Sequence, residues 1–169
     1  MINITFPDGN VRQYAEGTTA LDVAKSISEG LARVVLAASI NGEVRDLSRP
    51  ITSDSTIVFH KWDDKEGKQT YWHSSAHLLA EALESLYPGT KFGIGPAIDN
   101  GFYYDVDTGD RMLTPADFAK IEQKVLELAR TKSEYVRTDV SKADAIKYFT
   151  EKNDEYKLDL LERLEDGNI

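Results

Sequence analysis

The sequence predicts an α+β protein with two domains, and three observations support that fold class. Short extended segments separated by turn residues fill roughly the first 60 positions, with one helical stretch among them. A charged, glycine-containing stretch without periodicity follows at residues 63–68 and is typical of a linker. Beyond it the pattern is mainly helical, beginning at residues 71–83. We therefore expect one domain at residues 1–62 and a larger one at 63–169.

The first domain contains several expected strands and one expected helix. The strands either alternate between apolar and polar side chains or form short apolar runs, and they are expected at residues 2–6, 11–14, 34–40, 43–46 and 56–60. A helix is expected at 20–29, capped by Thr18 or Thr19 and ended by Gly30. Asn41-Gly42 is the strongest turn signal. This order of elements predicts a small β-grasp, an antiparallel-rich sheet with a helix across one face.

The second domain begins with the helix that carries the candidate site. Leucine and alanine run through residues 71–83 without an internal proline or glycine, which predicts a helix of about four turns. His73 and His77 are four residues apart, so a helix places them on one face, with Glu81 a turn further on. Two such imidazoles can hold a metal, relay protons or bind an anion. The alternative is a pair of partly buried histidines with satisfied hydrogen bonds.

The remaining pattern predicts a hairpin followed by helices. An aromatic strand is expected at 102–107, and Gly93 and Gly95 before its turn let a backbone or a ligand approach closely. The later expected elements are an amphipathic helix from Pro115 capped by Thr114, a strand at 135–140, a helix capped by Ser141 that runs to about Lys152, and a helix from Glu155. The last residues read as the entry to a strand, so this domain is expected to be incomplete at its C-terminal end.

Composition limits the possible classes of protein. The chain has no cysteine, which excludes disulfides and thiolate ligands, and no apolar run reaches the roughly 18 residues that span a membrane. A cytoplasmic protein is the expectation. Residues 1–61 carry 6 basic and 7 acidic side chains, whereas residues 62–169 carry 14 and 22. This balance disfavours broad nucleic-acid binding but leaves room for a local RNA contact.

Two sets of motifs resemble known families. The first 61 residues resemble a TGS domain, a ubiquitin-like module, with Phe6-Pro7-Asp8-Gly9 and Ile40-Asn41-Gly42 at the expected places. Two later runs are similar to the editing domain of bacterial threonyl-tRNA synthetase. They are Trp72-His73-Ser74-Ser75-Ala76-His77-Leu78-Leu79 and Phe92-Gly93-Ile94-Gly95-Pro96-Ala97-Ile98-Asp99-Asn100-Gly101-Phe102-Tyr103-Tyr104-Asp105. Together they follow the order of that family's N-terminal region. The resemblance covers essentially the whole chain.

The resemblance implies a site that hydrolyses mischarged seryl-tRNA(Thr). His73 and His77 match the HxxxH half of the family's editing site, and Lys157 matches a lysine of that site, so these three are the expected catalytic residues. Tyr104 and Gly95 are expected to bind the substrate and the 3′ end of the tRNA. The second half-site of the family, Cys-x-x-x-His, has no counterpart, because no cysteine occurs and no histidine follows His77.

The resemblance also implies partners and cofactors. The expected partner is the acceptor end of tRNA(Thr), with a homodimer formed through domains that this chain lacks. Aminoacylation with ATP, Mg²⁺ and Zn²⁺ is assigned to those domains, so no cofactor and no metal ligand is expected here. Two other functions stay open: a non-catalytic RNA-binding or regulatory TGS module, and a metal-dependent hydrolase. A catalytic zinc would need Glu81 or His60 as a third protein ligand.

Overall fold

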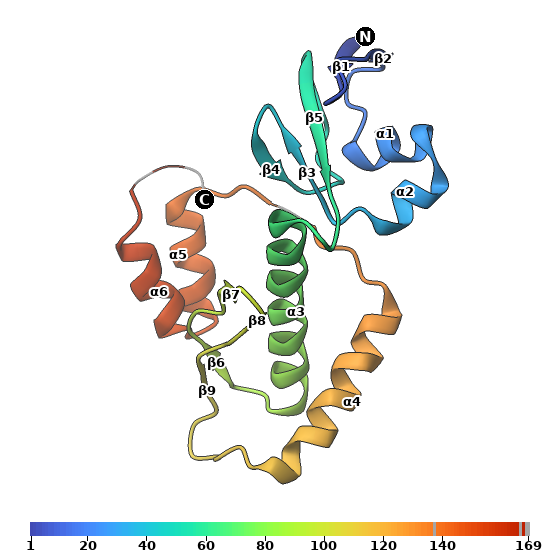
Figure 1. Ribbon diagram of the computed structural model, residues 1–169. Helices are drawn as coiled ribbons and strands as arrows, with labels where there is room; N and C mark the ends of the chain where they lie inside the picture. The colour runs from blue at the N-terminus through green and yellow to red at the C-terminus, as the bar shows by residue number, and fades with distance from the viewer. Residues whose placement is uncertain (137, 166, 168–169) are drawn as a thin grey trace. The chain divides into compact units, whose positions relative to one another are not determined.

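The computed structural model describes residues 1–136, 138–165 and 167. The described elements are β1 (Ile2–Thr5), β2 (Val11–Tyr14), α1 (Ala20–Ile27), α2 (Glu29–Val34), β3 (Ala37–Ile40), β4 (Glu43–Arg45), β5 (Ser55–His60), α3 (Lys65–Leu86), β6 (Lys91–Phe92), β7 (Ala97–Ile98), β8 (Gly101–Phe102), β9 (Val106–Asp107), α4 (Pro115–Thr131), α5 (Lys142–Glu151) and α6 (Glu155–Glu162) (Figure 1). No helix in this part of the chain is long and apolar enough to cross a membrane.

The chain divides into two compact units. The first unit comprises Met1–Trp72 with Ile98–Asn100, and the second comprises His73–Ala97 with Gly101–Ile169. Helix α3 belongs to both, because the division falls between its residues 72 and 73. The domain boundary expected at residue 62 rests on the charged stretch in the sequence and stays a prediction.

The first unit is a β-grasp, as predicted. Its sheet has the order β2-β1-β5-β3-β4, in which β1 is antiparallel to β2 and parallel to β5, while β3 is antiparallel to β4 and β5. Ala20 and Val23 of α1 pack against Ile4 and Ile57 in the central strands. Alternating apolar residues therefore supply one buried sheet face, and the amphipathic helix covers it.

The stretch expected to form one helix at 20–29 forms two. Thr19 caps α1, because its backbone N–H donates to the Asp22 carboxylate and its hydroxyl accepts from the Asp22 N–H. The helix ends at Ser28, whose backbone is extended at φ −166° and ψ 148°. The Ser28 hydroxyl then accepts from the N–H of Leu31 and so caps α2.

Other boundaries in this unit also differ from expectation. Gly30 does not end the first helix, since it lies inside α2. The strand expected at 34–40 begins only at Ala37 because α2 extends into that range. The stretch expected to be a linker at 63–68 is partly helical, since α3 starts at Lys65.

The early start of α3 has a local cause. The Asp64 carboxylate accepts from the Lys61 N–H at 2.7 Å, and the Asp64 carbonyl accepts from the Lys68 N–H at 3.0 Å. A Cβ atom at Gly67 would lie 1.9 Å from the Lys61 carbonyl oxygen, so only glycine allows this approach. The first turn is made of charged and small residues, which carry no apolar stripe and hence gave no helical signal.

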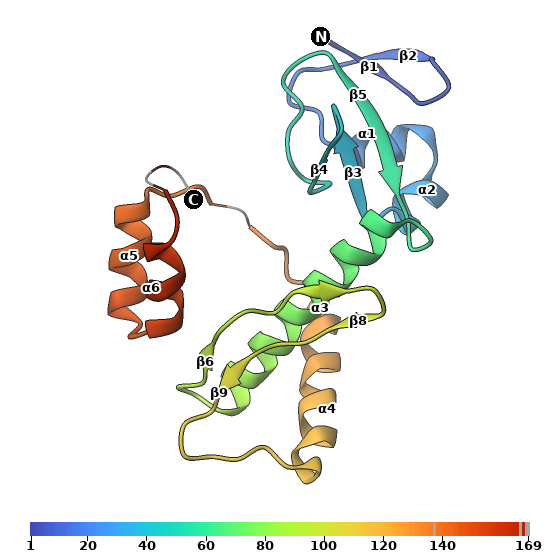
Figure 2. The same ribbon diagram turned by 60° about the vertical axis from the view of Figure 1, so that its left-hand side comes forward.

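The second unit is organised around the C-terminal part of α3. Leu83 and Tyr87 pack with Ile121 of α4, and Phe92 and Val106 of the β6–β9 ribbon pack against them. Figure 2 shows this ribbon beside α3. β6 and β9 are antiparallel, with Lys91 opposite Asp107 and Phe92 opposite Val106, and β7 pairs with β8.

The helix starts of this unit are confirmed. Thr114 precedes α4, which begins at Pro115, and the Thr114 N–H donates to the Asp117 carboxylate at 2.9 Å. The Ser141 hydroxyl accepts from the Asp144 N–H and caps α5. Such side-chain acceptors replace the partners that the first amides of a helix lack, which is why these positions could be predicted.

Two strand predictions in this unit are wrong. The strand expected at 102–107 is interrupted, because the Asp105 carbonyl accepts from the Gly93 N–H while the Asp105 N–H donates to the Ile94 carbonyl. One residue thus faces two, as in a β-bulge. No strand includes any described residue of the range 135–140, and Arg137 lies outside the described residues.

Candidate functional site

A cavity of about 430 Å³ in the second unit brings the predicted site residues together. It is lined by His73, His77, Gly93, Ile94, Gly95, Pro96, Tyr104 and Lys157. All five residues selected from the sequence are among them. They come from α3, from the segment between β6 and β7, from the interrupted stretch before β9, and from α6. The structure therefore brings these residues to one place, while their catalytic and binding roles stay predictions.

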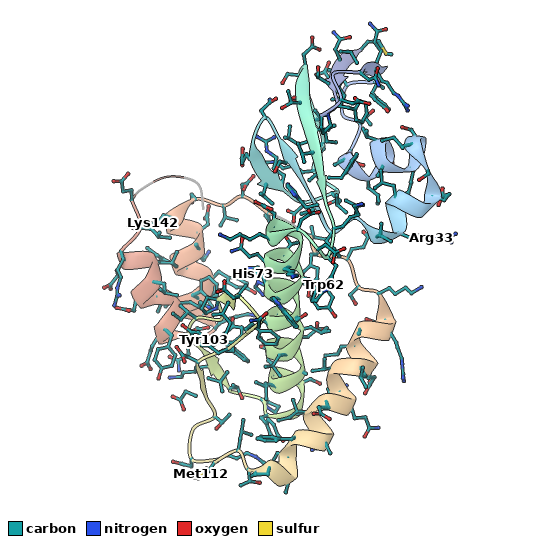
Figure 3. The ribbon with its side chains drawn as sticks, viewed as in Figure 1. Arg33, Trp62, His73, Tyr103, Met112 and Lys142 are labelled. Carbon is teal, nitrogen blue, oxygen red and sulfur yellow. The ribbon has the colours of Figure 1, made fainter. Side chains whose placement is uncertain are left out.

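The two histidines interact directly. His73 lies on α3 (Figure 3), and its Nε2 is 3.1 Å from the Nε2 of His77. The rings meet edge to face, with centroids 4.6 Å apart and planes at 85°. A hydrogen bond between two ring nitrogens needs one donor and one acceptor, so at least one of the two Nε2 atoms carries no proton.

The electrostatics of the pair favour a neutral His77. Both rings keep some solvent access, yet partial burial lowers the pKa of His77, and the neighbouring His73 and the Lys157 ammonium lower the pKa further. His77 is therefore unprotonated at neutral pH. A neutral imidazole with an accessible nitrogen can accept a proton from a water molecule.

Lys157 supplies the positive charge at the cavity. It lies in the first turn of α6, where the Asp154 side chain accepts from its N–H at 3.1 Å. Its Nζ donates to the Gly93 carbonyl at 2.8 Å. This single fixed contact leaves two N–H groups of the ammonium for water or for an anionic oxygen.

Tyr104 and Gly95 form one wall of the cavity. A Cβ atom at Gly95 would lie 2.4 Å from the Tyr104 Cδ2, so the tyrosine ring rests against the glycine α-carbon. The Phe92 ring also contacts this tyrosine edge to face, with centroids 5.6 Å apart. Burial, followed by the charge of Asp154, raises the pKa of Tyr104, so its hydroxyl stays protonated at neutral pH.

Sequence reasoning missed a residue beside the histidines. The Tyr135 hydroxyl donates to the Ser74 carbonyl at 3.1 Å, and its ring centroid is 6.2 Å from that of His77. Burial, followed by the charge of Glu81, raises the pKa of Tyr135. No local pattern could have found this contact, because the partners are 61 residues apart and the tyrosine was expected in a strand. Ile94 and Pro96 were likewise not selected, although they adjoin the glycine that was.

The third ligand required by a zinc hydrolase does not join the histidines. No group of three histidine or carboxylate side chains that could hold a metal ion occurs within residues 1–136, 138–165 and 167. His60 lies in the first unit, where its Nε2 is 2.6 Å from the Ser39 hydroxyl and its Nδ1 is 3.7 Å from the Glu66 carboxylate. Glu81, the other candidate, is an exposed residue of α3.

Comparison with known proteins extends these observations. A family model described as the TGS domain matches residues 2–61. Threonine–tRNA ligases are similar along the whole chain: those of Cytophaga hutchinsonii, Parabacteroides distasonis and Flavobacterium psychrophilum are 66%, 62% and 50% identical to it over 169 residues. The match covers 100% of this chain but 26% of each relative, so the chain spans about a quarter of their length.

The β-grasp topology agrees with the family match over the first unit, and the similarity to the ligases continues without interruption through the second. The chain therefore carries a TGS domain and corresponds, over its full length, to the N-terminal region of bacterial threonine–tRNA ligases.

Proposed function

We propose that the chain is the N-terminal part of a threonine–tRNA ligase and that its histidine cavity hydrolyses serine from mischarged tRNA(Thr). The arrangement of His73, His77 and Lys157 around one cavity carries this proposal. The need for such a site is physical. Serine differs from threonine by one methyl group, and a pocket distinguishes such a difference by only about 1–3 kcal/mol. A second, hydrolytic site removes the errors that binding cannot prevent.

The cavity contains a proton acceptor and a positive charge, two of the groups that ester hydrolysis requires. The reaction needs a water molecule, a proton acceptor and a positive charge near the developing oxyanion. Neutral His77 accepts the proton of the attacking water at Nδ1, while its Nε2–H donates to the His73 Nε2 through the contact at 3.1 Å. The imidazolium then returns a proton to the ribose oxygen that leaves as the ester bond breaks. The Lys157 ammonium stabilises the oxyanion or the adjoining phosphate with the N–H groups that Gly93 does not use.

Tyr104 serves the nucleic-acid end of the substrate in this proposal. Its protonated hydroxyl can donate to the ribose or to the ester, and its ring can stack on the terminal adenine. Gly95 contributes through its missing side chain, because any Cβ there would displace the ring. The acceptor end of tRNA(Thr) is thus the proposed partner.

The remaining assignments concern a longer, cytoplasmic protein. We propose that threonine activation with ATP, Mg²⁺ and Zn²⁺, and assembly into a homodimer, reside in segments outside these 169 residues. A Cys-x-x-x-His segment from the same region would complete the editing site. No step described above uses a metal ion.

Deacylation of seryl-tRNA(Thr) by the full-length protein tests the proposal. Replacing His73 and His77 together by alanine is expected to lower the rate by at least the roughly 10²–10⁴-fold typical of one general acid or base. Glu84→Gln is the matched control, because Glu84 is an exposed residue of the same helix about two turns from His77, and the rate of this variant should stay unchanged. Near-normal deacylation by a double variant with native circular dichroism would show that the histidines are structural.

A further inference from the structure

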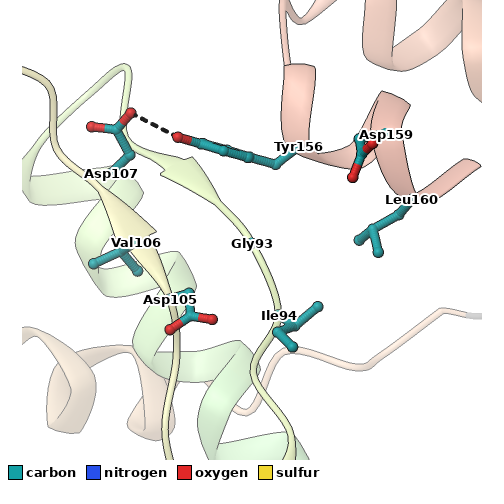
Figure 4. Close-up of a pocket in the computed structure, with 8 residues that line it drawn as sticks. All are labelled: Gly93, Ile94, Asp105, Val106, Asp107, Tyr156, Asp159 and Leu160. Atoms are coloured by element: carbon teal, nitrogen blue, oxygen red, sulfur yellow. Dashed lines mark hydrogen bonds between the residues drawn. The ribbon is translucent and has the colours of Figure 1, made fainter.

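Helix α6 is attached to the β6–β9 ribbon by three consecutive side chains. Glu155 accepts from the Lys91 Nζ at 3.0 Å, and the Tyr156 hydroxyl donates to the Asp107 Oδ2 at 3.2 Å (Figure 4). Lys157 makes the third contact, with the backbone carbonyl in the cavity wall described above. The hydrogen bond to Asp107 raises the pKa of Tyr156, so its hydroxyl remains a donor at neutral pH.

The first two contacts involve two ribbon residues that are paired across the strands. Lys91 and Asp107 are opposite each other in the antiparallel ladder. The carbonyl that binds Lys157 belongs to Gly93, two residues beyond Lys91. Because adjacent residues of one helical turn move together, fixing Tyr156 against this pair also fixes the backbone from which the Lys157 side chain reaches the Gly93 carbonyl.

Apolar packing does not fix α6 in the same way. Among the described residues, the buried core of the second unit consists of side chains from α3, α4 and the segments between them, and it includes none from α5 or α6. Those two helices bury Ala145 and Leu161. The three polar contacts therefore join α6 to the ribbon at a place that the apolar core of the unit does not reach.

A second cavity lies behind these contacts. It measures about 310 Å³ and is lined by Gly93, Ile94, Asp105, Val106, Asp107, Tyr156, Asp159 and Leu160 (Figure 4). Open space beside Tyr156 means that few side-chain atoms hold its ring in place. The hydroxyl bond to Asp107 consequently determines the ring position more than packing does.

We propose that Tyr156, with Asp107 as its acceptor, is a positioning residue that holds the Lys157 ammonium in the histidine cavity. The Lys91–Glu155 ion pair assists, but it is exposed and hence screened by water and salt. This inference rests on the proposed function of the cavity. A displacement of about 1 Å in a group near the reacting atoms can cost up to about a hundredfold in rate.

Tyr156→Phe in the full-length protein tests the inference, because it removes only the hydroxyl. We expect the kcat for seryl-tRNA(Thr) deacylation to fall about tenfold while KM stays within about twofold, since Tyr156 does not line the histidine cavity. In a Lys157→Ala background the same substitution should change kcat less than about twofold. Tyr148→Phe is the matched control, since it removes a hydroxyl from the adjacent α5 and should leave deacylation unchanged.

A conservative change at the acceptor provides a second test. Asp107 accepts from the Gly109 N–H through Oδ1 and from Tyr156 through Oδ2. In Asp107→Asn the amide oxygen can keep the first bond while the amide nitrogen donates to the tyrosine oxygen. We therefore expect Asp107→Asn to retain more than half of the deacylation rate, whereas Asp107→Ala should resemble Tyr156→Phe.

The outcomes separate the two proposals. If Lys157→Ala and the histidine variants deacylate normally, the proposed function of the cavity fails. If they lose activity but Tyr156→Phe is as active as the parent protein, only the positioning role fails. The positioning role also fails if Tyr156→Phe has the same effect with and without Lys157, because an additive loss means that the hydroxyl acts independently of the ammonium.

Discussion

The two units differ in how completely they bury their side chains. Ile4, Val23 and Ile57 of the first unit are at most 1% exposed, whereas Leu83, Tyr87 and Ile121 at the centre of the second are 3–8% exposed. The first unit seals its core between a sheet and a helix. In the second, loops, short ribbons and helix ends line cavities that include those of about 310 and 430 Å³ described above. The first unit thus has a closed apolar core, and the second holds polar groups around open space.

The largest effect is expected in the sealed core. Ile57→Ala removes a fully buried side chain between β1, β3 and α1, and such changes typically destabilise a protein by about 2–5 kcal/mol. Urea unfolding, followed with one spectroscopic probe in each unit, measures the loss in the free energy of unfolding. The loss should appear in the first unit, and Val58→Ala, a 42% exposed neighbour on the same strand, should change stability far less. Equal losses for the two variants would contradict the sealed core.

The next effect is expected at the cavity wall. Gly95→Ala should lower deacylation about 10- to 100-fold with little loss of stability, because the new methyl group displaces the Tyr104 ring. Gly30→Ala in α2 is the matched control, since its Cβ would meet only the Ser28 Oγ at 3.8 Å. That change should leave deacylation intact and slightly favour the helix. Deacylation kinetics and thermal unfolding of both variants test this prediction. Normal deacylation by Gly95→Ala would mean that the ring does not define the wall.

Sequence patterns predicted the first unit better than the second for a physical reason. Strand alternation, the Asn41-Gly42 turn and a cap at Thr19 are local signals, and in a β-grasp they agree with one another. The break at Ser28 was missed because serine, although favoured at caps, also occurs inside helices. In the second unit the bulge at Asp105 depends on pairing with a distant strand.

The candidate site was likewise predicted only where local patterns or the family resemblance indicated its residues. Helical spacing alone placed His73 and His77 on one face, the glycines before the turn indicated a close approach at Gly95, and the family resemblance added Tyr104 and Lys157. None of these could show the Tyr156–Asp107 bond, which joins residues 49 positions apart. Contacts of that kind depend on how α6 packs against the ribbon, and no periodic pattern in the sequence predicts this packing.

Two similar helix caps allow a smaller, matched comparison. Asp22 and Asp117 each accept from the threonine three residues earlier, but Asp117 also accepts from Arg111 at 2.5 Å and Tyr87 at 3.2 Å. Hydrogen bonds to Thr114 and Arg111 hold the Asp117 pKa well below its ordinary value of 3.8. Asp117→Ala should therefore destabilise the second unit more than Asp22→Ala destabilises the first. Urea unfolding of both variants at pH 7 measures the two losses in the free energy of unfolding.

The sign of the pH effect follows from the lowered pKa. Asp117 contributes stability that is fully present above pH 3.8 and is lost as the pH falls below that value. The second unit of the parent protein should lose stability on acidification more steeply than the Asp117→Ala variant does. Identical acid transitions for the two proteins would show that the additional contacts of Asp117 do not stabilise the unit.

The smallest expected effect concerns His77. Because its pKa lies below the ordinary 6.5, the deacylation rate should fall on acidification with a midpoint below pH 6.5, as the neutral base becomes protonated. The unfolded chain binds that proton more readily, so stability should also decline as the pH drops from 6.5 toward the folded-state pKa. His77→Gln should remove this part of the decline in urea unfolding. A kinetic midpoint at or above pH 6.5 would mean that His77 is not the base.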